Sequence, residues 1–154
     1  MIPFLVLVVA ALALRALGAA GLHPLGSWIW CVRGGLAAMF LLTASAHWGR
    51  RGRELAAMVP RVFPRADLMV GVTGVLEILG AAGLLIPRTT SAAAVCLALL
   101  LLAIFPANVR AAHERLTIGS RPATKLPLRT LLQLVYIGAL VVAGFPEIIG
   151  LTAG

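Results

Sequence analysis

The chain has 154 residues, of which 61% are hydrophobic and 12% are charged, and its mean hydropathy is +1.03. About a quarter of the residues in a soluble domain are charged, so this composition excludes an ordinary soluble protein and indicates a single membrane-embedded bundle. The net charge of +8 arises from arginines in the loops between apolar segments, so we interpret it as a signal of topology and of contact with anionic membrane lipids, and we predict no nucleic-acid binding.

Five apolar segments are long enough to cross a bilayer, since about 20 helical residues span roughly 30 Å of hydrocarbon. The first segment lacks the basic start of a signal peptide, so we expect it to be retained as a helix. The sequence therefore predicts an all-α, multi-pass membrane protein with five transmembrane helices. The five expected helices are Met1–Gly21, Gly26–Trp48, Asp67–Pro87, Thr90–Val109 and Pro127–Gly150.

The loop charges alternate along the chain. The loops after the second and fourth segments are rich in arginine, whereas the other two loops carry only His23 and Arg88. Because basic loops stay in the cytoplasm, we predict a cell (inner or plasma) membrane protein with its N-terminus inside and its C-terminus outside. Within the first basic loop, Arg53–Val59 forms either a short interfacial helix or an irregular turn. The basic loop residues are Arg50, Arg51, Arg53, Arg61, Arg65, Arg110, Arg115, Arg121 and Lys125.

Glu77 is the one charged residue in the stretch from Val70 to Pro87. An ionised carboxylate near the middle of a bilayer is costly, so such a residue faces the bundle interior, has a partner or is held protonated. Small residues mark close helix packing in membranes, and several of them share the helical face of Glu77. We therefore expect Glu77 to point into the bundle, on a face with Val70, Thr73, Gly74, Gly80 and Ala81.

Polar residues on three other segments share inward faces with apolar ones. On the second segment, Arg33 and His47 lie on one face, and counting 1.5 Å per residue from the outer end places Arg33 within reach of Glu77. The sequence therefore predicts an Arg33–Glu77 ion pair. On the fourth segment, Pro106 leaves the Leu102 carbonyl without its usual donor, so a neighbouring side chain or a water must bond it.

These positions form two predicted polar layers, which are either a ligand cavity or a structural network that fixes helix register. For Glu77 both interpretations stay open, whereas the structural one is favoured for His47 and Asn108 because both lie near a helix end. Residues Arg129, Gln133 and Tyr136 follow a helical spacing on the fifth segment. The cytoplasmic-side layer holds His47, Asn108, Arg129 and Gln133, and the deeper layer holds Arg33, Glu77 and Tyr136.

The sequence points to no metal site, catalytic group or evident cofactor. The three histidines lack ligand spacing, and no nucleotide-binding loop or nucleophile–base pair is visible. Cys31 and Cys96 lie inside apolar segments without a C-x-x-C motif, so we interpret both as packing residues.

Three stretches resemble the DoxX-like family of small integral membrane proteins: MVPRVFPRADLMVGVTGVLEILGAAGLLIP, FPANV and RTLLQ, within a region from Trp30 to Leu140. The resemblance implies a four-helix core at residues 26–150, made by the second to fifth segments, with an additional N-terminal transmembrane helix at residues 1–22. It also implies a membrane subunit of the kind found with quinone-linked oxidoreductases or oxidative-stress complexes. The family's recurrent polar positions match Arg33, His47, Glu77, Asn108, Arg129 and Gln133.

The chain departs from related bundles in two ways. The N-terminal helix is extra, which suggests a role in docking or oligomerisation, and the chain lacks a vicinal dithiol, which argues against disulfide exchange. Three functions remain open: a redox-linked subunit whose polar site binds a quinone-like or lipid-like ligand, a non-catalytic structural or assembly subunit that contacts other membrane proteins or itself, and a solute or proton pathway. The pathway ranks last, because five helices are few for a transporter and no inverted repeat is apparent.

Overall fold

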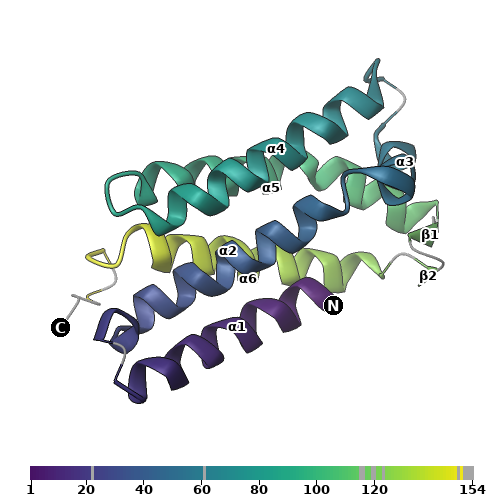
Figure 1. Ribbon diagram of the computed structural model, residues 1–154. Coiled ribbons are helices and arrows are strands. Elements are labelled where there is room, and N and C mark those ends of the chain that lie inside the picture. Colours follow the sequence, from purple (N-terminus) through teal and green to yellow (C-terminus); the bar gives the residue numbers. More distant parts are fainter. Residues whose placement is uncertain are drawn as a thin grey trace.

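A computed structural model describes residues 1–21, 23–60, 62–114, 117–118, 121–122, 124–148 and 150 (Figure 1). The described chain is all-α apart from one short antiparallel hairpin. The predicted loop cations Arg61 and Arg115 lie outside the described residues. The elements are α1 (Ile2–Ala19), η1 (His23–Gly26, a 3-10 turn), α2 (Trp28–Ser45), α3 (Gly49–Met58), α4 (Ala66–Leu85), α5 (Thr90–His113), β1 (Thr117–Ile118), β2 (Arg121–Pro122) and α6 (Leu126–Gly144).

Helices α1, α2, α4, α5 and α6 are long and apolar enough to cross a membrane, which confirms the prediction of an all-α, multi-pass protein. Two boundaries differ by four residues or more from those expected. Helix α6 ends at Gly144 because Phe145 precedes Pro146, and a residue before proline avoids the helical conformation. Helix α5 continues through Pro106 to His113, past the expected end at Val109.

Helices α2, α4, α5 and α6 form a four-helix core, and α1 packs against the outside of α2 (Figure 1). The core is filled by large apolar side chains, among them Leu36, Phe40 and Leu140, which are almost completely buried. Close packing between α4 and α5 depends on glycine, because a Cβ at Gly80 would lie 2.5 Å from the Leu97 side chain. In α4, the buried positions include Val70, Gly74, Glu77, Gly80 and Ala81, which confirms the predicted inward face except at Thr73, which is half-buried.

The first basic loop contains helix α3, so the structure confirms the helical alternative and begins the helix at Gly49 rather than Arg53. Gly49 has a φ of +72°, a conformation that glycine adopts without strain, and it turns the chain sharply after α2. The side chains of Arg50, Arg51 and Arg53 are exposed, while Met58 is buried. Helix α3 and the β1–β2 hairpin lie at the same end of the bundle as the start of α1 (Figure 1).

Candidate functional site

Glu77 lies inside the bundle with 3% of its surface exposed. The hydroxyl of Thr43, on α2, donates a hydrogen bond of 2.7 Å to Oε2 of Glu77. The ring of His47, two residues past the end of α2, places its Nδ1 atom 3.9 Å from the same oxygen. A carboxyl, a hydroxyl and an imidazole therefore meet where α2 crosses α4.

The proton positions in this cluster follow from what each atom is able to accept. His47 Nδ1 lies 3.0 Å from the backbone carbonyl of Thr43, and a carbonyl only accepts, so Nδ1 carries a proton and Nε2 remains for a ligand or water. The Thr43 hydroxyl has one proton and two possible acceptors, because the Phe40 carbonyl lies 3.0 Å away. The cluster therefore offers hydrogen-bond acceptors to a bound group, at His47 Nε2 and at the Glu77 carboxylate, and one donor when Glu77 is protonated.

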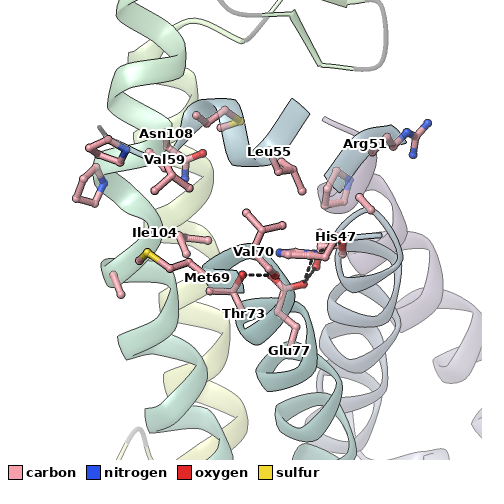
Figure 2. A pocket seen from close by; sticks show the side chains of 18 of the residues that line it. His47, Arg51, Leu55, Val59, Met69, Val70, Thr73, Glu77, Ile104 and Asn108 are labelled. Carbon is pink, nitrogen blue, oxygen red and sulfur yellow. Dashed lines mark hydrogen bonds and ion pairs between the residues drawn. The ribbon is translucent and has the colours of Figure 1, made fainter. Parts of the chain in front are cut away.

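A cavity of about 630 Å³ opens beside this cluster. Figure 2 shows Glu77 and His47 on one side of the cavity and Leu55 and Val59, from α3 and its end, on the opposite side. Helix α3 thus covers the end of the cavity that lies toward the arginine-rich loops. Its C-terminal end is fixed by Arg110 of α5, whose Nη1 atom donates a hydrogen bond to the Val59 carbonyl.

The predicted Arg33–Glu77 ion pair is wrong for the described residues. Arg33 Nε donates a 3.0 Å hydrogen bond to the Ala143 carbonyl, and its guanidinium lies 5.2 Å from the centre of the Trp30 ring. Arg33 therefore satisfies a free carbonyl at the end of α6, where the helix dipole favours a cation. Ser91 bonds the next carbonyl, that of Gly144, at 2.8 Å.

Arg33 and Glu77 do not pair because they lie at different depths along α2 and α4. Thr43, the observed partner of Glu77, lies ten residues after Arg33, which is about 15 Å along the helix axis. That distance exceeds the reach of an arginine side chain toward a buried carboxylate on the neighbouring helix. The two predicted layers are corrected accordingly: Glu77 belongs with His47, and Arg33 belongs to the opposite end of the bundle, beside the end of α6.

The remaining predicted site residues form a second group between α5 and α6. Arg129 Nη1 donates a 2.7 Å hydrogen bond to Oδ1 of Asn108, and its Nε bonds the Thr124 carbonyl at 3.0 Å. Gln133 is 8% exposed and donates to the Leu101 carbonyl at 3.1 Å, one residue before the carbonyl expected to need a donor. Tyr136 is half-buried against the apolar core.

Of the seven predicted site residues, the described cavity lining contains His47, Glu77 and Asn108. The sequence analysis missed Thr43, although its position one helical turn before His47 was a usable signal. It also missed the covering role of α3, which depends on the path of a loop rather than on a pattern. Within the described ranges, no group of three or more His, Cys, Asp or Glu side chains could hold a metal ion.

A comparison with known protein families matches residues 36–143 to a family described as a domain of unknown function, DUF8561. The matched region begins in α2 and ends in α6, and it contains the whole cluster of Thr43, His47 and Glu77. Comparisons with curated proteins and with solved structures gave no match.

Proposed function

The chain belongs to the DUF8561 family of unknown function, and from that premise we propose that it binds an amphipathic, membrane-soluble ligand in the cavity beneath α3. The observation that carries this proposal is the cluster of Glu77, Thr43 and His47 at the side of a largely apolar cavity. Ligand sites commonly have this form, with volumes of about 300–1,000 Å³, apolar walls and a few convergent polar groups.

The cluster favours a polar but uncharged head on the ligand. An ionised Glu77 would repel an anionic head. His47 Nε2 and the ionised Glu77 carboxylate accept hydrogen bonds from hydroxyl groups, and a protonated Glu77 carboxyl donates one to a carbonyl. Asn108 adds a polar group on the α5 side of the cavity, since its Oδ1 is already occupied by Arg129 and its amide nitrogen remains to donate. A quinone or quinol ring has this chemistry, and so does the uncharged head of a diacylglycerol.

The resemblance to DoxX-like proteins supports the quinone alternative and a redox-linked subunit. On this proposal the four-helix core is DoxX-like, α1 is additional, and the arginine-rich end with α3 faces the cytoplasm of a cell whose inner or plasma membrane holds the protein. No redox chemistry of the chain itself is required, because the cavity only has to hold and orient the ligand head.

Tryptophan fluorescence tests the proposal. Trp48 packs close to Gly74 of α4, beside the cavity, so replacing Trp28 and Trp30 with Phe leaves a single reporter there. Decylubiquinone or diacylglycerol, titrated into detergent-solubilised protein, should change the Trp48 fluorescence until the binding site is saturated. Glu77→Gln should weaken the binding of whichever probe binds the wild-type protein by roughly tenfold, because it changes a hydrogen-bonding partner of the ligand head. Glu147→Gln, at an exposed outer position, is the matched control. Equal titrations for Glu77→Gln and the control would refute the proposal.

A second function, a structural or assembly subunit, is favoured by α1. Leu7 is the buried residue of this helix, so most of its apolar surface is left to lipid or to another membrane protein. This alternative predicts that the chain co-purifies with a membrane partner after gentle solubilisation and that deletion of residues 1–22 abolishes the association. Purification as an isolated chain under these conditions would count against it.

A further inference from the structure

The cavity extends to the lipid-facing surface of the bundle between α4 and α5. On each helix the exposed residues follow a stripe with helical spacing, which marks the side turned to lipid. The stripe on α5 includes Val95, Leu99, Leu102, Ala103 and Pro106, and the stripe on α4 includes Leu68, Met69, Val72 and Leu79. Met69, Ala103 and Pro106 belong to these stripes and also line the cavity. The cavity therefore reaches lipid at this place.

Elsewhere along α4 and α5, close packing closes the route from the lipid to the cavity. In the outer half of the bundle, Gly80 lies against the Leu97 side chain, and a Cβ at Gly83 would lie 2.8 Å from the Cβ of Ala93. At the cytoplasmic end, α3 covers the cavity and is tied to α5 by the Arg110–Val59 hydrogen bond. Toward the cytoplasmic end, α4 and α5 diverge in Figure 1, and Met69 of α4 and Ala103 of α5 line the cavity.

We propose that the ligand reaches Glu77 from within the bilayer, through a portal between α4 and α5 bordered by Met69, Ile104 and Ala103. This inference rests on the proposed function and adds the class of ligand: a small uncharged head on a single apolar tail, with the head beside Glu77 and the tail in the portal. In Figure 2, Met69 and Ile104 lie close to one another at the side of the cavity, across from His47.

The side chains that border the portal suit the apolar tail of a ligand. Met69 is a flexible apolar side chain that adapts to different shapes, and Ala103 and Ala107 are small, so they leave room between the helices. Phe63, which is 49% exposed and also lines the cavity, adds apolar surface near the start of α4. On the opposite side the cavity touches Leu42 of α2 and Ile2 of α1, which defines the competing route.

Stopped-flow measurement of decylubiquinone binding, read from Trp48 fluorescence, tests the portal. Ala103→Phe should slow association roughly tenfold, because the ring narrows the route without changing the polar cluster. Ala107→Phe serves as a second variant in case Ala103→Phe does not fold. Ala92→Phe, on the lipid-facing stripe of α5 but remote from the cavity, is the matched control and should bind at the wild-type rate. The tail-free head, 2,3-dimethoxy-5-methyl-1,4-benzoquinone, should be slowed less than decylubiquinone.

The outcomes separate this inference from the proposed function. If the wild-type protein binds no probe, the proposed function fails, and the portal fails with it. If the wild-type protein binds and Ala103→Phe and Ala107→Phe associate as fast as Ala92→Phe, only the portal is overturned. Slower association in Leu42→Phe but not in Ala103→Phe would place the route between α1 and α2 and would likewise overturn it.

Discussion

At the scale of single residues, the bond between Thr43 and Glu77 links α2 to α4 inside the membrane. We expect Thr43→Val and Glu77→Gln to be energetically coupled, since neighbours in one hydrogen-bond network show interaction energies of about 0.5–3 kcal/mol. Arg33→Gln and Glu77→Gln should instead be additive within about 0.5 kcal/mol, because Arg33 bonds the Ala143 carbonyl. Unfolding of the single and double variants in mixed micelles measures both cycles.

The two cycles control one another, because they share Glu77→Gln and are measured in the same micelles. A larger interaction energy between Arg33 and Glu77 than between Thr43 and Glu77 would contradict the observed arrangement. It would support the predicted Arg33–Glu77 ion pair instead. The comparison also avoids relying on a single destabilising variant, since any general cost of Glu77→Gln cancels in each cycle.

At the scale of helices, two glycines of α4 differ in what a methyl group would meet. A Cβ at Gly74 would lie 2.8 Å from the Cβ of His47 and 3.1 Å from the Trp48 ring, whereas one at Gly71 would meet nothing within 4 Å. Gly74→Ala should therefore push α4 away from the turn that follows α2 and lower the free energy of unfolding by about 1–3 kcal/mol. Gly71→Ala is the matched control and should stabilise the helix by up to about 1 kcal/mol, because alanine is the better helix former. Similar unfolding curves for the two variants would show that the helices are not in close contact at Gly74.

Helix α3 provides a second prediction at this scale. Arg110 bonds the carbonyl of Val59 and also pairs with Glu114, so Arg110→Met removes the contact that holds the end of α3 against α5. Amide hydrogen exchange in α3 should become faster, because local opening costs less once a fixing contact is lost. Arg88→Met removes an exposed cation between α4 and α5, outside α3, and should leave that exchange unchanged. Unaltered exchange in Arg110→Met would show that α3 is held by its apolar residues alone.

The same helices show how far the sequence predicts the structure. Hydropathy was sufficient to predict the candidate spans, and the small residues around Glu77 were sufficient to predict that it faces inward. Both predictions depend on the sequence of one helix at a time. The partner of Glu77 was missed because depth was counted from the end of each helix as if the ends were level. Thr43 lies two residues before the end of α2, whereas Glu77 lies eleven residues after the start of α4. That offset is set by packing between helices, which hydrophobic periodicity does not encode.

At the scale of the whole molecule, the two arginine-rich connections lie at one end of the bundle, so a single orientation places both in the cytoplasm. We expect Arg53→Cys to resist a membrane-impermeant maleimide in intact cells and to react after lysis, and Glu147→Cys to react in intact cells. Native Cys31 is fully buried and Cys96 lies within a candidate span, so replacing both with alanine gives a clean reporter. Labelling of Arg53→Cys in intact cells would show that the protein has the opposite orientation. The end of the cavity that α3 covers would then face the outside. The side of the membrane on which α3 lies therefore decides which compartment the covered end of the ligand cavity faces.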